Sequence, residues 1–347
     1  MSWHICNAYE LFDGYRTYWD SINRENGNHV LLDSLFWKSL VDWLGSREVC
    51  LVLNDTSKGK GVALIERGGY GFWRTFQPSQ APLGPIIFDR LAAIHLGEHI
   101  CDLISDLPGY PLGFAVTQQD PDVTCFGNLN GTPAVEKLDY IQTPRLTISG
   151  KYEDYWKQRR KNLTHNLSRQ RRRLREEGGV LELAMDRTAE AVADAVREYG
   201  LLETTGWKGE EGSAVAADNV QGRFYREMLQ NFCSRGEAVI YRLRLNGKTV
   251  ASDLCLQRDG TLVILKTAYD ESVQGLSLGL LLHQEIFQSV FEEGKIRVIE
   301  FYGRLRDWHT KWTNEIRTMY HINFYRHRWV GTARRWLKNA AVKKGAS

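Results

Sequence analysis

The stretch that most constrains the fold spans residues 262–302 and contains a glycine-bearing turn. Residues 261–268 are a short apolar, partly β-branched run, which predicts a mostly buried strand. Residues 280–293 keep apolar side chains at roughly helical spacing, and Gly294 is placed to end that helix. Residues 296–302 predict a second strand. A strand, turn, helix and strand in this order predict a βαβ unit with parallel strands.

The turn before this helix has the features of an anion site. Ser277 is a good N-cap residue, and Gly275 and Gly279 let the backbone come close to a ligand. The free amides and the dipole of a helix N-terminus favour a phosphate or pyrophosphate, so a nucleotide-bearing acyl donor fits here. Two other interpretations stay open. One is an ordinary capped helix, and the other is a serine-hydrolase turn with Ser277 as nucleophile, although eight residues separate this serine from the strand end.

Length and composition indicate a soluble two-domain protein. The 347 residues exceed the usual size of one domain, and 43% hydrophobic with 25% charged residues is an ordinary globular composition. The net charge of +3 is too small to indicate nucleic acid, so we expect no DNA partner. The cysteines lie apart, without a Cys-x-x-Cys pair, which favours reduced thiols. No signal peptide and no apolar run near the ~20 residues of a membrane span is present, so we expect a cytoplasmic location.

The first half of the chain predicts an α+β domain with a loop rich in proline and glycine. The expected helices are an aromatic one within 1–33, then 35–44 and 89–107, and the expected strands are 49–53, 61–66, 70–77, 113–117 and 134–141, with the loop at 78–85. In helix 89–107, His95 and His99 share a face with Asp102 and Asp106. Such spacing can bind a metal, but no third ligand is fixed by the sequence. A solvated polar face is therefore favoured, and no metal is expected.

The second half repeats part of this order. Helix 222–235 precedes strands 237–245 and 249–258, which Asn246-Gly247 joins as a hairpin turn. The same order of helix, strand and strand occurs at 35–66, which predicts a worn internal duplication. Only the second copy has the glycine-bearing turn. We therefore expect one active copy and one copy that shapes the acceptor groove.

Two basic segments flank the second half. Residues 152–177 predict one long helix rich in arginine, for which nucleic acid, an anionic ligand or membrane surface, and a solvated linker are the alternatives, the linker being favoured. Residues 329–344 predict a basic helix that either lies on an anionic membrane or is a docked or frayed terminus. The expected division is an N-terminal domain at 1–148, the basic helix at 149–178, a C-terminal domain at 179–330 and a basic tail at 331–347.

Several short segments together resemble one family. They are Lys-Thr-Ala-Tyr-Asp-Glu at 266–271, Ser-Leu-Gly-Leu-Leu-Leu at 277–282, Glu-Phe-Tyr-Gly at 300–303, Lys-Trp at 311–312 and Glu-Thr-Thr-Gly-Trp-Lys-Gly at 203–209. This pattern resembles the cellulose-biosynthesis-associated branch of the GNAT acyltransferases, whose relatives include the Fem-type peptidyltransferases. The resemblance covers residues 150–330 well and 30–150 loosely. It departs from the family at Leu278, where proline is usual, and at Glu300, where aspartate is usual.

The resemblance implies both a fold and an activity. The implied fold class is α+β, with tandem GNAT-like domains, each a mixed, mainly antiparallel sheet flanked by helices, of which the first is degenerate. The implied activity is N-acyl transfer from acetyl-CoA or another acyl-CoA to an amino-sugar or related amine in polysaccharide biosynthesis. Two alternatives remain: a Fem-type transferase that uses aminoacyl-tRNA, and a non-catalytic GNAT fold that acts as an assembly partner.

Such a transfer needs a phosphate anchor, a strand edge for the acyl donor and a group that accepts a proton. The predicted donor-binding residues are Lys266, Tyr269, Gln274, Gly275, Ser277, Gly279 and Leu280. The predicted acceptor-binding residues are Trp207, Lys208, Tyr302 and Lys311. Glu300 is the first candidate for the proton acceptor because it lies at the end of the second parallel strand, and Asp253 is the second. Only the resemblance gives Trp207 a functional role.

Overall fold

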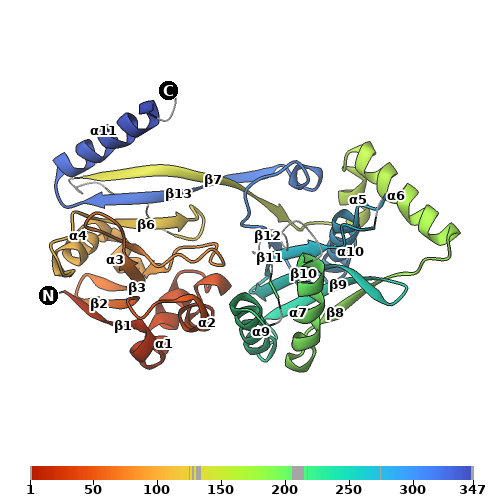
Figure 1. Ribbon diagram of the computed structural model, residues 1–347, viewed down its shortest axis with the longest axis horizontal. Helices are drawn as coiled ribbons and strands as arrows, with labels where there is room; N and C mark the ends of the chain where they lie inside the picture. Colours follow the sequence, from red (N-terminus) through yellow and green to blue (C-terminus); the bar gives the residue numbers. More distant parts are fainter. Residues whose placement is uncertain are drawn as a thin grey trace. The chain divides into compact units, whose positions relative to one another are not determined.

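The computed structural model describes residues 2–124, 126, 129, 134–204, 215, 216, 218–273 and 275–344. The chain forms two compact units, one made of residues 1–141 and 318–347 and the other of residues 142–317. This division differs from the expected one, because a strand near the end of the chain completes the sheet of the first unit. The chain enters the second unit along one long strand and leaves it along another (Figure 1).

The first unit has a mainly antiparallel sheet with helices on both faces. Its strands lie in the order β1, β2, β3, β4, β6 and β13, with β5 paired to β3, and among the pairings of the described residues only that of β4 with β6 is parallel. The elements are β1 (Trp3–Asn7), α1 (Ala8–Glu25), η1 (Val30–Leu32), α2 (Ser34–Leu44), β2 (Cys50–Thr56), β3 (Gly59–Arg67), β4 (Phe72–Thr75), β5 (Ile86–Phe88), α3 (Arg90–Ile94), α4 (Leu96–Asp106), β6 (Gly113–Gln119), the start of β7 (Val135–Thr147), the end of β13 (Glu315–Tyr325) and α11 (Arg328–Lys344).

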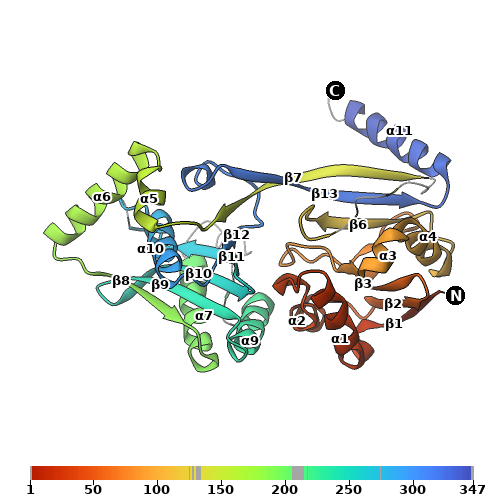
Figure 2. The same cartoon turned by 180° about the vertical axis from the view of Figure 1, so that it is seen from behind.

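The second unit repeats this arrangement. Its strands lie in the order β8, β9, β10, β11, β12 and β7, and within the described part of this unit only β11 and β12 pair as parallel strands. Its elements are α5 (Tyr152–Lys157), α6 (Lys161–Glu176), β8 (Leu181–Asp186), α7 (Ala189–Thr204), α9 (Val220–Cys233), β9 (Ala238–Leu245), β10 (Lys248–Arg258), β11 (Thr261–Tyr269), α10 (Leu278–Glu293), β12 (Val298–Glu300) and η2 (His309–Lys311). Figure 2 shows the same elements from behind.

The predicted duplication is confirmed and is longer than expected. Strand, helix, helix and three strands follow one another as β1, α1, α2, β2, β3 and β4 in the first copy, and as β8, α7, α9, β9, β10 and β11 in the second. In each copy the last of these strands is parallel to the next strand added to the sheet. The predicted α+β class with mainly antiparallel sheets is likewise confirmed.

Local sequence signals account for several element ends. Asn246 and Gly247 have φ values of 50° and 80°, which is the left-handed backbone that a two-residue hairpin of this kind requires. Gly294 ends α10 with φ of 64°, where a side chain would be strained. Both turns were predicted. Asn7 and Asp33 cap α1 and α2 through their side chains, because each accepts a hydrogen bond from an amide of the first helical turn.

The single helix predicted at 152–177 is wrong, since α5 and α6 are separated at residues 158–160. The Arg159 guanidinium lies 4.4 Å from the Tyr155 ring centre and donates to the Trp312 carbonyl oxygen. Tyr155 Oη donates to the same oxygen at 2.9 Å. These contacts hold the end of α5 against the core residue Trp312, at the point where the predicted single helix is interrupted. The helix predicted at 89–107 is also interrupted, at His95.

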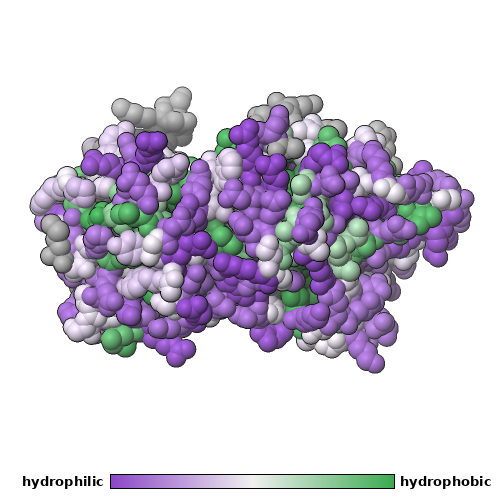
Figure 3. Space-filling model, turned by 90° about the horizontal axis from the view of Figure 1, so that it is seen from below, coloured by the Kyte–Doolittle hydropathy of each residue, from purple (hydrophilic) through white to green (hydrophobic). Residues whose placement is uncertain are grey.

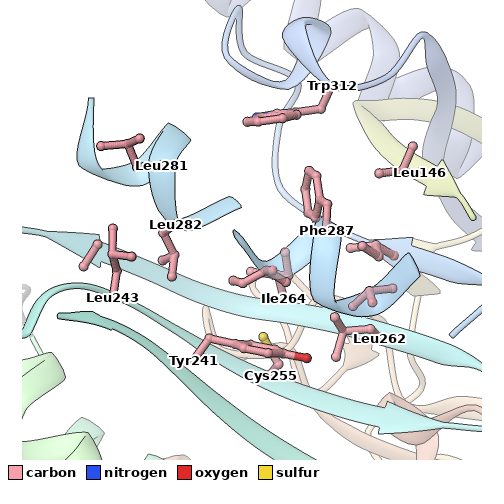
Figure 4. Close-up of a cluster of buried hydrophobic side chains, with 14 of the residues drawn as sticks. Leu146, Tyr241, Leu243, Cys255, Leu262, Ile264, Leu281, Leu282, Phe287 and Trp312 are labelled. Atoms are coloured by element: carbon pink, nitrogen blue, oxygen red, sulfur yellow. The ribbon is translucent and has the colours of Figure 1, made fainter. Parts of the chain in front are cut away.

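The core of the second unit lies between its sheet and α10. Figure 4 shows Leu281, Leu282 and Phe287 of α10 in one buried cluster with the strand residues Tyr241 and Ile264, and the Phe287 ring lies towards Trp312. All of these side chains are at most 5% exposed. The removal of these apolar side chains from water is the main contribution to the stability of such a unit. The opposite face of the same sheet packs against α7 and α9.

The C-terminal helix α11 is docked at its first turn. Val330 is buried and Gly331 lies against the Tyr325 ring, whereas Trp329 and Trp336 are 63% and 70% exposed. Contact of α11 with an anionic membrane stays a prediction. None of the helices described is long and apolar enough to cross a membrane. The face drawn in Figure 3 is mainly hydrophilic, with small hydrophobic patches between.

Candidate functional site

The N-terminus of α10 is open towards solvent at its first turn. The first hydrogen bond of the helix runs from the Leu281 amide to the Ser277 carbonyl oxygen at 2.9 Å, so the amides of residues 278–280 come before the helical ladder. Ser277 occupies the N-cap position, but its side chain makes no capping hydrogen bond, so that part of the prediction is wrong. Instead, Gln170 of α6 accepts from the Ser277 amide at 2.8 Å and donates to its Oγ at 3.1 Å.

A cavity of about 450 Å³ lies at this helix end. It is lined by two residues of β11, five residues of the turn and first helical turn, and two aromatic side chains farther along. They are Thr267, Tyr269, Leu276, Ser277, Leu278, Gly279, Leu280, His283 and Trp308. A Cβ added at Gly279 would lie 3.3 Å from the Tyr269 ring, so glycine lets that ring lie close to the helix. The volume suits a small-molecule ligand or part of a larger one.

Beside the cavity, β11 has a free edge. Its parallel pairing with β12 begins at Thr261 and stops where Val263 lies opposite Glu300. Residues 264–269 continue as strand, and among the described residues they pair only with β10. The amides and carbonyls of an unpaired edge can bind an extended ligand by strand addition. β12 is shorter than the strand predicted at 296–302, which is why the two strands part here.

A bulge in β11 decides which side chains face the cavity. Leu254 pairs with Lys266 and Cys255 pairs with Ile264, so Leu265 is left without a partner in β10. Because side chains alternate along a strand, this extra residue turns Thr267 and the following odd positions to the α10 face. Lys266 is turned to the other face, where its ammonium lies 3.5 Å from the Glu203 carboxylate of α7. Only the Lys266 backbone is therefore next to the cavity.

Asp253 and His283 form a buried pair at the wall of the cavity. Asp253 lies opposite Thr267 on β10, and His283 lies on α10, one turn beyond Gly279. Asp253 Oδ2 and His283 Nε2 are 3.1 Å apart, and the two residues are 0% and 2% exposed. The His283 ring stacks on Trp308 with ring centres 5.0 Å apart. The sequence singled out Asp253 but not His283.

Glu300 lies in an ion-pair cluster. Its carboxylate is 2.7 Å from the Arg317 guanidinium and 3.5 Å from that of Arg145, and the residue is 5% exposed. Arg317 also lies over the Tyr302 ring at 5.1 Å from its centre. Tyr302 follows β12 with φ of 49°, an uncommon backbone conformation for a tyrosine that is often found near functional sites.

The other predicted residues fall into three groups. Gly275, Gly279, Ser277, Leu280 and Tyr269 lie in or beside the turn at the cavity, whereas Lys311 lies half-buried in η2. Gln274, Trp207 and Lys208 lie outside the described residues. Sequence reasoning missed His283, Trp308 and Gln170. His283 could have been found from the sequence, because it is a histidine in an otherwise apolar helix face and a buried polar side chain needs a partner.

Positive charge from α6 lies close to the turn. A Cβ added at Gly275, whose φ is 80°, would be 3.2 Å from Nη1 of Arg173. Arg173 is itself paired with Glu177 at 2.7 Å, and both side chains are more than half exposed. Arg171 reaches α10, where it lies 2.5 Å from the Glu285 carboxylate. An anion at the start of α10 would therefore meet Arg173 as well as the helix amides.

Two of the four residues predicted to share a face of helix 89–107, His99 and Asp106, have other roles. His99 is buried and its Nε2 lies 3.2 Å from the Lys58 carbonyl oxygen. Asp106 accepts from the amides of Ser2 and Trp3. Among the residues that the structure describes, no three His, Cys, Asp or Glu side chains are grouped to hold a metal ion.

Comparisons with known proteins identify the fold of this site. Residues 157–310 match the family model of the acetyltransferase (GNAT) domain. No curated protein sequence matches the chain. The C-terminal domain of a putative lysylphosphatidylglycerol synthetase from Agrobacterium fabrum is similar in structure, with TM-score 0.57 at 12% identity over 93% of this chain and 96% of that one. FemX is similar with TM-score 0.56 at 8% identity, over 89% and 96% of the two chains.

A third similar structure is a conserved protein of unknown function from Bacteroides thetaiotaomicron, with TM-score 0.54 at 11% identity over 91% of this chain and 96% of that one. At these identities the likeness shows the fold alone. The chain therefore contains a GNAT-fold acetyltransferase domain, and the predicted tandem GNAT-like fold is confirmed. The cavity, the free edge of β11 and the start of α10 all lie within the matched residues.

Proposed function

We propose that the second unit transfers an acyl group from an acyl-CoA to an amine. The observation that carries the proposal is the cavity where the free edge of β11 meets the N-terminus of α10. Amides 278–280 and Arg173 would hold the pyrophosphate, and the backbone of residues 264–269 would hydrogen-bond the extended pantetheine arm. The thioester would then lie along β11, where backbone donors can stabilise the developing oxyanion.

For the acceptor, we propose an amino sugar or a related amine. This choice rests on the likeness of the sequence to the branch associated with cellulose and other exopolysaccharides. The half-buried Lys311 and the Tyr302 ring remain the described candidates for acceptor binding. Acetyl-CoA is the simplest donor to test, because the domain that matches residues 157–310 is an acetyltransferase domain.

Calorimetric titration with acetyl-CoA, longer acyl-CoA species and free CoA tests the donor site. We expect wild-type protein to bind and Gly279→Glu to bind at least about tenfold more weakly, a loss of about 1.4 kcal/mol, because the new carboxylate would lie among the anchoring amides. The added Cβ meets only the Tyr269 ring, which is 45% exposed and can move, so the variant should fold.

Gly14→Glu is the matched control. It adds the same side chain to helix α1 at an exposed position with no atom within 4 Å of the new Cβ, and it should leave CoA affinity unchanged. Wild-type protein that binds no CoA species would end the coenzyme A proposal. In that case a donor carried on tRNA becomes the leading candidate, because the exposed arginines of α6 suit a polyanion, and transfer would depend on added tRNA.

A further inference from the structure

The pair formed by Asp253 and His283 leaves two buried polar atoms unpaired. Asp253 Oδ1 and His283 Nδ1 have no hydrogen-bond partner among the described residues, and both are shielded from solvent. Buried polar atoms are nearly always paired, because an unpaired one costs about 1–3 kcal/mol. Two such atoms on one pair of side chains beside a cavity therefore call for a role other than stability.

The surroundings of the pair are apolar. Ala251 and Cys255 flank Asp253 on the same face of β10, and Leu282 and Phe287 lie near His283 on α10. Leucine or phenylalanine at these two positions would fit the core without desolvating a charge. The pair is thus held at a cost to stability, beside the cavity that Thr267 and Tyr269 line after the bulge of β11.

The geometry fixes the orientation of the imidazole. Its ring is parallel to Phe287 within 3°, with ring centres 5.6 Å apart, and it stacks on Trp308. With Nε2 towards the carboxylate, a neutral ring has its proton on Nε2 and its lone pair on Nδ1. His283 and the half-buried Trp308 both line the cavity, and an acceptor reaches the shielded Nδ1 only when these side chains move on binding. Catalytic hydrogen bonds often form only once the substrate is bound.

We propose that His283 is the catalytic base of the transfer and that Asp253 is the positioning residue that sets its tautomer. This inference rests on the proposed function. The amine nitrogen attacks the thioester carbonyl carbon, a C–N bond forms, and the carbonyl π electrons move to oxygen. Nδ1 takes one proton from that nitrogen. The carbonyl then re-forms, the C–S bond breaks, and the sulfur leaves with its electron pair and receives the proton as the free thiol. Glu300, held by two arginines, has a structural role instead.

The first test needs no substrate. In protein with ¹⁵N-labelled histidine, the ring nitrogens of His283, assigned by their loss in His283→Gln, should show a protonated Nε2 and a bare Nδ1 at neutral pH. Asp253→Asn offers an amide donor to Nε2, so the proton should move to Nδ1, as happens when the aspartate of a serine-protease triad is changed to asparagine. A wild-type His283 with a protonated Nδ1 would overturn the proposal, because no lone pair would remain.

The second test uses acetyl-CoA with glucosamine, an amino sugar, as the amine, and follows release of the CoA thiol above the rate without enzyme. His283→Gln should lower kcat by about 100-fold or more with KM for acetyl-CoA unchanged, the usual loss when a general base is removed. Asp253→Asn should lower kcat less, again at constant KM. His99→Gln is the matched control, since it removes an equally buried histidine from the first unit and should change neither constant.

The two tests separate this inference from the function on which it rests. If wild-type protein releases no thiol, the coenzyme A proposal fails while the tautomer still decides whether His283 offers a base. If wild-type protein is active and His283→Gln keeps its kcat while Glu300→Gln loses it, the base is Glu300 and the inference is wrong.

Discussion

His309 is a buried histidine whose charge state the fold controls. Burial lowers its pKa from 6.5 to about 4. Its Nδ1 accepts a hydrogen bond from the Arg306 amide at 2.9 Å, a bond that protonation of Nδ1 would break. The neutral ring also stacks on Trp308 with centres 3.6 Å apart. His309 thus supports the indole that lines the cavity.

This lowered pKa predicts how stability depends on pH. Between pH 6.5 and 4 the unfolded chain binds the His309 proton and the folded chain does not, so this group makes the free energy of unfolding fall as the pH falls. His309→Gln removes the titrating imidazole, so the free energy of unfolding of this variant lacks this dependence on pH. We expect the variant to be less stable than wild type at pH 7 by about 1–2 kcal/mol, from the lost hydrogen bond, and more stable than wild type by pH 4, because the lowered pKa costs wild type about 3 kcal/mol over that range. Urea unfolding at several pH values measures it, and a constant difference would contradict the prediction.

Arg173 offers a test of the anion site that leaves α10 unchanged. Its guanidinium is close to Gly275, so Arg173→Glu should weaken CoA binding by about three- to tenfold at low salt, and the difference should narrow at high salt as the charges are screened. Arg172→Glu is the control, because Arg172 is similarly exposed and also paired with a glutamate four residues on. Equal effects of the two substitutions would point to the overall charge of α6 rather than to a contact at the turn.

An element could be predicted from the sequence where the residues that determine it are close together along the chain. The hairpin at Asn246-Gly247 and the end of α10 at Gly294 follow from backbone conformations that few residues adopt, and both were predicted. The break between α5 and α6 was not, because the apolar spacing continues through it and its cause is the Trp312 carbonyl, far along the chain. Strand β1 was also missed, since it pairs with β2 beyond an entire helical region.

The candidate site likewise has parts that could be predicted from local sequence and parts that could not. Its turn, glycines and helix were predicted from a contiguous stretch, and Asp253 was named from the strand beside it. No sequence signal predicts the bulge at Leu265, yet this bulge determines that the side chain of Thr267, and not that of Lys266, faces the cavity. His283 was missed because in sequence it is one polar residue in an apolar helix, and only pairing of β10 with β11 brings Asp253 beneath it.

The two copies differ where the parallel strands part. In the second copy, β11 continues for six residues beyond its last pair with β12, whereas in the first copy β4 ends at Thr75, one residue beyond its last pair with β6. Thr75 and Thr117 hydroxyls there lie 2.5 Å apart, and Thr117 donates to Gln77 at 2.8 Å. The Gly84 amide donates to the Gln118 carbonyl oxygen at 3.0 Å. The loop predicted at 78–85 therefore fills the place that the cavity has in the second copy.

This difference predicts one donor site for each chain. A Cβ added at Gly84 would lie 2.1 Å from the Thr117 carbonyl oxygen, so only glycine lets the loop lie this close to β6. Titration of the full chain with CoA should give one binding site for each chain. Gly84→Ala should lower the melting temperature and leave both the number of CoA sites and the affinity for CoA unchanged. Gly69→Ala, with no atom within 4 Å of the new Cβ, is the control and should leave the melting temperature nearly unchanged. Two equal sites would mean that the loop moves aside for a ligand and that both copies bind donor.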